Sequence, residues 1–205
     1  TSNELTAQSI VTAKHHYFTN TDTLADQPDL KKAIVSAILC NEAELHYQDG
    51  SYMAKGNPID VALMAAGLKA KFDVPLWQKK HPCTDLIPYE TEHKFMATLH
   101  HDHVGRGFVY VKGAPEIILK KCKSQQVNGE VAALDVDYWQ DAIEKLTSEG
   151  QRVIAVAYKT VDNKKSDLLF DDVNDDLVLV ALFGLIDPPR PEAILAVGEC
   201  RRAGI

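Results

Sequence analysis

The chain has 205 residues, of which 45% are hydrophobic and 25% charged, so it has enough apolar material for one sizeable globular domain. Its formal net charge is −7 and its basic residues are scattered, which argues against nucleic acid as the main partner. The longest apolar run, Leu177 to Ile186, is far shorter than the ~20 residues that span a bilayer. We therefore expect a folded domain that does not itself enter a membrane.

The first third of the chain predicts one strand and two helices. Residues 5–18 mix Thr, Val, Ile, Tyr and Phe, a composition that favours a strand. A helix is expected to open at Pro28, because apolar residues follow it at helical spacing. A second helix is expected from Pro58 to about Lys71, with Asn57 as its N-cap. The Asp-Gly pair at 49–50 predicts a turn between them.

The rest of the chain predicts strands in runs, separated by helices. Two helices are expected: one from Pro115 to about Lys123, and one that follows Asp135 and stops at Gly150. The Asn-Gly pair at 128–129 predicts a hairpin, the polar stretch 164–176 a loop, and residues 191–203 a last helix. The strands are expected at 83–89, 93–100, 107–112, 152–159 and 177–186. Adjacent strands between helices indicate an α+β fold.

The stretch 108–122 reads as a strand, a sharp turn and a helix. Lys112 ends the strand, Gly113 permits close backbone approach, and Pro115 suits the first turn of a helix. A cation beside free amides at a helix start suits an anion. The alternative is an ordinary lysine at the end of an edge strand, and this stretch alone does not decide between the two.

Five segments carry a resemblance, and they occur in order along nearly the whole chain. They are Thr1 to Thr6, Gly56 to Leu63, Lys112 to Glu116, Gly150 to Ala155, and Asp187 to Arg190. The third, Lys-Gly-Ala-Pro-Glu, resembles the nucleotide-binding signature of P-type cation-transporting ATPases. The others resemble that family's segment after the phosphorylation motif, its Gly-Asp-Pro-Thr-Glu-x-Ala-Leu, its Gly-x-Arg-x-Leu-Ala strand and its hinge. The chain thus resembles the nucleotide-binding domain of such a pump, closest to prokaryotic type II pumps.

The resemblance implies a fold and a division of the chain. The fold is a twisted antiparallel β-sheet flanked by helices. Residues 1–6 would follow the phosphorylation motif as a hinge, residues 7–186 would form the nucleotide-binding domain, and residues 187–205 would be the returning hinge and the first helix of a truncated phosphorylation domain.

The resemblance also implies a function and a setting. The domain would capture ATP for a pump that couples ATP hydrolysis to cation transport. It would be a cytoplasmic domain of an integral membrane protein, in the plasma membrane of a prokaryote. Its partners would be the phosphorylation, actuator and transmembrane domains of the same full-length chain. The transported ion is not encoded here, because ion selectivity resides in membrane helices.

Two residues are implied for the adenine pocket by a segment that resembles the family's Phe-x-x-x-x-Lys. Tyr89 would stack on the base, since stacking needs only a flat π-face, and Lys94 would line the same pocket. The alternatives are a half-buried strand tyrosine and a solvated turn lysine.

The remaining site residues are carried over from the other segments. Asp60 falls on the glutamate that binds the adenine amino group, but its spacing from Asn57 equally suits a role at the helix start. Lys112 matches the pocket lysine, and Gly113 and Ala114 would lend their backbone to the nucleotide. Arg152 matches the arginine that holds the phosphates, a task that suits a planar, permanently charged guanidinium; the alternative is a strand-end arginine paired to a carboxylate.

The resemblance also concerns the family's hinge motif and its nucleophile. Asp187 and Arg190 match the hinge, where the aspartate lies near the ribose and phosphates when the domains close. The family's nucleophile is the aspartate of Asp-Lys-Thr-Gly-Thr, a sequence that this chain does not contain. Mg²⁺ would be needed by the full-length enzyme to neutralise the phosphate charge. The chain is therefore expected to bind ATP without hydrolysing it.

Two rival functions remain open. The first is a freestanding adenine-nucleotide-binding module with no transport role. The second is a metal-binding domain, because His100, His101 and His103 surround Asp102 and imidazole and carboxylate both bind zinc. These residues fall in a predicted hairpin turn, where solvated side chains are the expected state.

Overall fold

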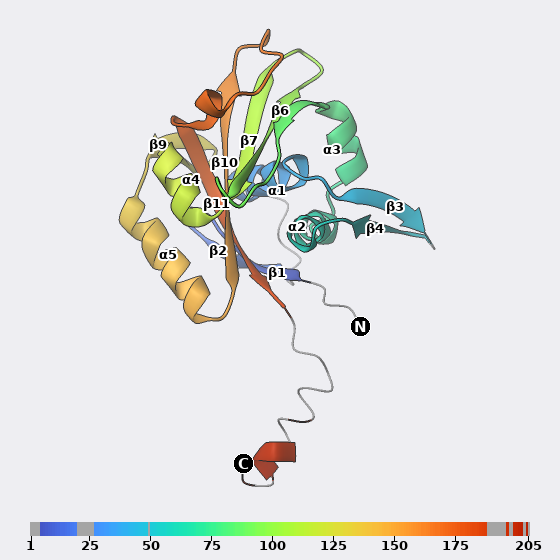
Figure 1. Cartoon of the computed structure of the whole chain (residues 1–205), viewed down its shortest axis with the longest axis vertical. Coiled ribbons are helices and arrows are strands. Elements are labelled where there is room, and N and C mark those ends of the chain that lie inside the picture. The colour runs from blue at the N-terminus through green and yellow to red at the C-terminus, as the bar shows by residue number, and fades with distance from the viewer. Residues whose placement is uncertain are drawn as a thin grey trace.

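The computed structural model describes residues 5–19, 27–48, 50–187, 196, 199–202 and 204 (Figure 1). Its body is a nine-stranded sheet with the main strand order β2-β1-β11-β10-β7-β6-β5, to which β8 and β9 add a branch beside β11. All pairs are antiparallel except β8 with β11. The strands are β1 (Thr6–Val11), β2 (His16–Phe18), β5 (Cys83–Ile87), β6 (Phe95–His101), β7 (Gly107–Gly113), β8 (Cys122–Val127), β9 (Glu130–Ala133), β10 (Arg152–Val161) and β11 (Leu177–Ile186).

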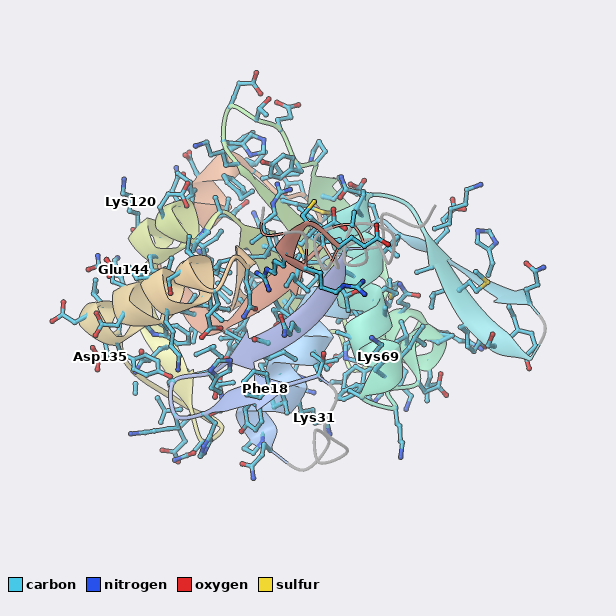
Figure 2. The ribbon with its side chains drawn as sticks, turned by 90° about the horizontal axis from the view of Figure 1, so that it is seen from below. Phe18, Lys31, Lys69, Lys120, Asp135 and Glu144 are labelled. Atoms are coloured by element: carbon cyan, nitrogen blue, oxygen red, sulfur yellow. The ribbon has the colours of Figure 1, made fainter. Side chains whose placement is uncertain are left out.

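Helices cover both faces of this sheet. On one face lie α1 (Pro28–Leu39), α2 (Pro58–Lys69) and α3 (Val74–Lys80), and on the other lie α4 (Pro115–Lys121) and α5 (Val136–Ser148). Seen from below, the polar side chains of the two helix layers point outward on opposite sides, with Lys31 and Lys69 on one side and Lys120 and Glu144 on the other (Figure 2). The predicted α+β fold with an antiparallel sheet flanked by helices is thereby confirmed.

Each face of the sheet has its own hydrophobic core because strand side chains alternate between faces. Along β10, Ile154 and Val156 pack with the α1–α2 core, whereas Val153 and Ala155 pack with the core that contains Trp139 of α5. The apolar β11 lies in the middle of the sheet and contributes to both cores, which explains why its sequence shows no polar alternation.

Most local signals in the sequence gave the correct element. Helix α2 begins at Pro58, and the Asn57 side chain accepts a hydrogen bond from Ile59 N at 3.0 Å. Asp135 caps α5 in the same way, accepting from Tyr138 N at 3.1 Å. The predicted Asn-Gly hairpin joins β8 to β9, with φ of 52° at Asn128 and 86° at Gly129.

Three predictions were wrong. Residues 5–18 form a hairpin of β1 and β2 instead of one strand, turned by a hydrogen bond from Thr12 N to the His15 carbonyl. The short helix α3 was missed, and the stretch 164–176 is not simply an exposed loop. Leu168 and Val173 are buried there, beside a 3-10 turn at Phe170–Val173. The predicted helix 191–203 lies mostly outside the described residues.

Two further features complete the fold. A separate hairpin, β3 (Glu44–Gln48) with β4 (Ser51–Lys55), projects beside α2 (Figure 1). Thr6, the first residue of β1, pairs with Ile186, the last residue of β11. The two ends of the sheet-forming chain therefore lie side by side.

Candidate functional site

A cavity of about 380 Å³ opens between the first turn of α2 and the ends of the central strands. Six of the nine predicted site residues line it, although they come from well-separated parts of the sequence: Asp60, Tyr89, Lys112, Gly113, Arg152 and Asp187. The other lining residues were not predicted: Leu5, Glu42, Asn57, Pro58, Ile59, Met96 and Ile154. Asn57, Pro58 and Ile59 precede Asp60, Ile154 lies two residues after Arg152, and Met96 pairs with Lys112, but Glu42 had no sequence signal of its own.

Strand register gives the cavity two distinct ends. Met96 of β6, Lys112 of β7 and Val156 of β10 are aligned across the sheet. Arg152 lies four residues before Val156 on the same face, which places it about 13 Å along the strand. We call the part around Asp60, Lys112 and Met96 the inner end, and the part around Arg152 and Asp187 the outer end.

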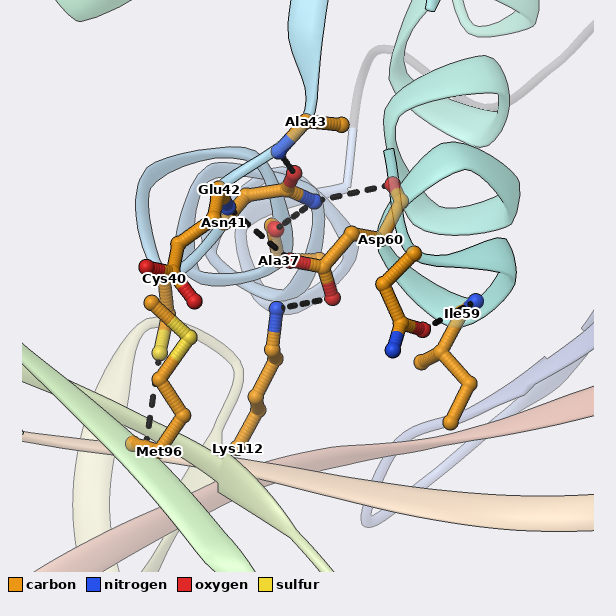
Figure 3. A network of polar contacts seen from close by, with 10 residues as sticks. Ala37, Cys40, Asn41, Glu42, Ala43, Ile59, Asp60, Met96 and Lys112 are labelled. Atoms are coloured by element: carbon orange, nitrogen blue, oxygen red, sulfur yellow. Dashed lines mark hydrogen bonds and ion pairs between the residues drawn. The ribbon is translucent and has the colours of Figure 1, made fainter. Parts of the chain in front are cut away.

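The inner end is built on a buried ion pair between Lys112 and Asp60. The Lys112 Nζ lies 2.5 Å from Asp60 Oδ1, and each residue is only 5% exposed. The second carboxylate oxygen of Asp60 accepts a hydrogen bond from Glu42 N at 2.9 Å (Figure 3). The helix cap is instead supplied by Asn57, so hydrogen bonding at the start of α2 is not the role of the Asp60 carboxylate.

Position 113 must be glycine because neighbouring atoms leave no space for a side chain. A Cβ atom at this position would lie 2.5 Å from the Lys94 carbonyl oxygen and 2.7 Å from the Phe95 Cβ, distances that real Cβ atoms do not show. Ala114 N donates to the same Lys94 carbonyl at 3.0 Å. The strand end and the segment before β6 are thus held against each other by backbone contact.

Two of the predicted residues, Lys94 and Ala114, do not line the cavity. Lys94 is exposed, has a φ of 56°, and directs its Nζ toward Glu116 Oε1 at 3.8 Å. Ala114 donates its backbone N–H to the Lys94 carbonyl oxygen and is not among the residues that line the cavity. Arg190 lies outside the described residues.

Tyr89 and Arg152 are both accessible from the cavity. Tyr89 is 48% exposed and follows the end of β5, so it is a loop residue and not the strand tyrosine of the alternative. Arg152 is exposed at the start of β10. Within the part of the chain that the structure describes, no ion pair engages its guanidinium, contrary to the alternative in which a carboxylate neutralises it.

A thiol also lies at the inner end. Cys40 is fully buried and its Sγ contacts the Met96 carbonyl oxygen at 3.5 Å. Burial raises the pKa of Cys40 to about 11, so the group is a neutral thiol at physiological pH. It therefore contributes packing and no nucleophile.

The histidine turn is organised around other contacts. Asp102 is buried, accepts from Val104 N and Arg106 N, and pairs with the Arg106 Nε at 2.7 Å. His100 is also buried, with Nδ1 2.8 Å from the His81 carbonyl oxygen, so the expectation of solvated side chains was wrong for both residues. Among the described residues, no three His, Cys, Asp or Glu side chains gather as metal ligands.

The fold and the cavity define the class of protein: an α+β domain with a cavity whose described lining includes one exposed aromatic ring and one guanidinium that makes no ion pair with the described residues. Residues 29–192 match the family model described as "P-type ATPase, cytoplasmic domain N". The chain belongs to this family. No helix among the described residues is long and apolar enough to cross a bilayer.

Curated relatives agree with the family match. The chain is 36% identical over 179 residues to "Cation-transporting ATPase pma1" of Synechocystis, a match that covers 87% of this chain and 20% of the relative. It is 31% identical over 182 residues to "Calcium-transporting ATPase 1" of Lactococcus lactis, covering 87% of this chain and 20% of that protein. It is also 31% identical over 208 residues to "Sodium/potassium exporting P-type ATPase cta3" of Schizosaccharomyces pombe, a match that covers 98% of this chain and 20% of that protein. The chain therefore spans about a fifth of the length of these relatives.

Proposed function

We propose that the cavity binds ATP, with the adenine at the inner end and the phosphates at the outer end. The observation that carries this proposal is the convergence of residues from four family segments and the Tyr89 loop on one cavity of about 380 Å³. Its volume falls within the ~300–1,000 Å³ range of small-molecule sites.

The chemistry of the two ends supports this orientation. Ile59 and Met96 give the inner end apolar walls, and Tyr89 offers a π-face for stacking. Lys112 is a poor candidate for the phosphates because Asp60 already neutralises its charge. Arg152 at the outer end retains its charge and its fork of donors, which suits phosphate oxygens.

The proposed role in the whole protein follows from the family. The domain presents ATP to an aspartate of an Asp-Lys-Thr-Gly-Thr motif elsewhere in a longer chain, in a Mg²⁺-dependent reaction that drives cation transport. The adjacent ends of β1 and β11 suit a domain joined to a neighbour by two linkers, as the hinge assignment of residues 1–6 and 187–205 requires. Actuator and transmembrane domains of that chain, in a prokaryotic plasma membrane, complete the proposal.

The function is tested with the purified chain and labelled ATP. We expect saturable binding of ATP, no release of labelled phosphate in the presence of Mg²⁺, and no acid-stable labelling of the protein. Turnover that survives rigorous purification, or an absence of ATP binding, would show the proposal to be wrong. Sequencing of the flanking gene separates a pump from a freestanding module, since a pump encodes the Asp-Lys-Thr-Gly-Thr motif upstream and apolar spans on both sides.

A further inference from the structure

We infer that Glu42 selects the base, by accepting a hydrogen bond from the exocyclic amino group of adenine. This inference rests on the proposed ATP site and adds a residue that no sequence motif marks. Glu42 lies in the short segment between α1 and β3, lines the cavity and is exposed to it.

The position of Glu42 is fixed by the segment that carries it. The neighbouring Asn41 side chain donates to the Ala37 carbonyl at 3.2 Å and to the Asp60 carbonyl at 3.0 Å, and accepts from Ala43 N at 2.8 Å. Glu42 N itself donates to the Asp60 carboxylate (Figure 3). These bonds attach the segment to the end of α1 and the first turn of α2, so Glu42 is placed at the inner end, where the base is proposed to bind.

At the inner end, Lys112 is paired with Asp60 and not with Glu42, so the Glu42 carboxylate is available to a ligand. Asp60 has one oxygen on Lys112 and the other on Glu42 N, and both members of the pair are buried. The Glu42 carboxylate, by contrast, makes no hydrogen bond or ion pair with any side chain or backbone group among the described residues. It is an accessible acceptor at the end of the cavity that holds the ring.

A carboxylate in this place distinguishes bases by the group at the purine 6-position. Adenine presents an amino group there, which donates to a carboxylate, whereas guanine presents a carbonyl oxygen, which a carboxylate repels. A purine with no group at this position gains no hydrogen bond from the carboxylate and is not repelled by it. The expected order of affinity is therefore ATP above purine riboside triphosphate, with GTP weakest.

The experiment compares ligands that carry the same three phosphates, so that changes in overall charge cancel. We expect the wild-type chain to prefer ATP over purine riboside triphosphate by about tenfold, the scale of one hydrogen bond to a charged group. Glu42→Ala should abolish that preference. Glu42→Gln should retain part of it and should improve GTP binding, because an amide also donates.

Glu44→Ala is the matched control, because it removes an exposed carboxylate two residues away that does not line the cavity. It should leave the preference intact. A preference for ATP that survives Glu42→Ala would overturn the inference. So would loss of discrimination between ATP and 2′-deoxy-ATP in that variant, because Glu42 would then serve the ribose. If the wild-type chain binds none of these triphosphates, the proposed function fails; if it binds them all equally, only the role of Glu42 fails.

Discussion

The two ends of the cavity are built in opposite ways. At the inner end, Asp60 and Lys112 are 5% exposed, paired with each other and tied to the segment before β3. At the outer end, Arg152 and Asp187 are exposed and stand where β10 begins and β11 has ended. One end is part of the folded core, and the other is a charged rim.

This difference separates stability from binding. A change to Asp60 or Lys112 at the inner end disturbs a buried charge, so it should weaken the fold together with the site. A change at the outer end removes an exposed charge, so it should weaken ligand binding and leave the fold nearly unaffected.

Replacement of Lys112 by Met should have the largest effect. It leaves the Asp60 carboxylate buried without its cation, and breaking a buried pair costs about 3–5 kcal/mol. The free energy of unfolding from urea titration measures the loss. Arg152→Met is the matched change at the outer end and should alter stability by less than about 0.5 kcal/mol.

A second variant distinguishes the loss of the Lys112 charge from the loss of its side-chain packing. In the Asp60→Asn, Lys112→Met double variant, the amide still accepts from Glu42 N and no unpaired charge remains. It should therefore be clearly more stable than Lys112→Met alone. If the two variants are equally destabilised, the side-chain volume and not the charge of Lys112 matters.

Loss of the ring at Tyr89 should weaken ATP and adenosine alike. Base–aromatic stacking contributes roughly 1–3 kcal/mol per base in nucleic-acid complexes, so a fall in affinity of about fivefold to 150-fold is expected for Tyr89→Ala. NMR titration with both ligands measures it. Tyr47→Ala is the control, since Tyr47 is 67% exposed on β3 and does not line the cavity. Unchanged affinities would mean that Tyr89 does not contact the base.

Family motifs gave residues at both ends of the cavity, but the sequence did not show how the inner end is held together. Arg152 and Asp187 were carried over from the Gly-x-Arg-x-Leu-Ala strand and the hinge motif, and each begins or directly follows a strand. The ion pair at the inner end joins residues 52 positions apart, and neither residue shows from its local pattern that it is buried. The sequence therefore left Asp60 open between the base and the helix start, and only the structure shows that its carboxylate binds Lys112 and Glu42 N.

The same distinction explains which parts of the fold were predicted. Asn57, Asp135 and the Asn-Gly turn act on their immediate neighbours, so their signals are local and were read correctly. The hairpin of β1 and β2 turns at residues 12–15, which contain no Gly, Pro, Asn or Asp, so no local signal marked this turn. Glu42 was missed for the same reason, because only the tertiary contact with α2 brings it to the cavity.

At the outer end, Arg152→Ala should weaken ATP binding and leave adenosine nearly unchanged, because adenosine has no phosphate. We expect the affinity for ATP to fall about tenfold. This is the low end of the range for a hydrogen bond to a charged group, because Arg152 is exposed. Added salt should weaken ATP binding more than adenosine binding, as Arg152→Ala does and Tyr89→Ala does not, because screening acts on charge and not on stacking.

Lys164→Ala is the control for loss of an exposed cation, since Lys164 does not line the cavity. Titration of both ligands against both variants, with circular dichroism to verify folding, decides the matter. If Arg152→Ala weakened adenosine as much as ATP, the assignment of the phosphates to the outer end would be wrong.

The smallest expected effect is that of Mg²⁺ on ATP affinity. Of the three carboxylates that line the cavity, Asp60 and Glu42 lie at the inner end, and Asp60 is already paired with Lys112. Asp187 is the one described carboxylate at the outer end, and it is exposed, so the described protein groups there offer Mg²⁺ a single solvated carboxylate. The metal should therefore change the ATP affinity of the chain by less than about tenfold, or 1.4 kcal/mol. Calorimetric titration with and without Mg²⁺ measures the change, and Asp187→Asn should reduce whatever effect is found. A larger gain would mean that the outer end holds a metal–phosphate site as well organised as the ion pair at the inner end, and the contrast between the two ends would no longer hold.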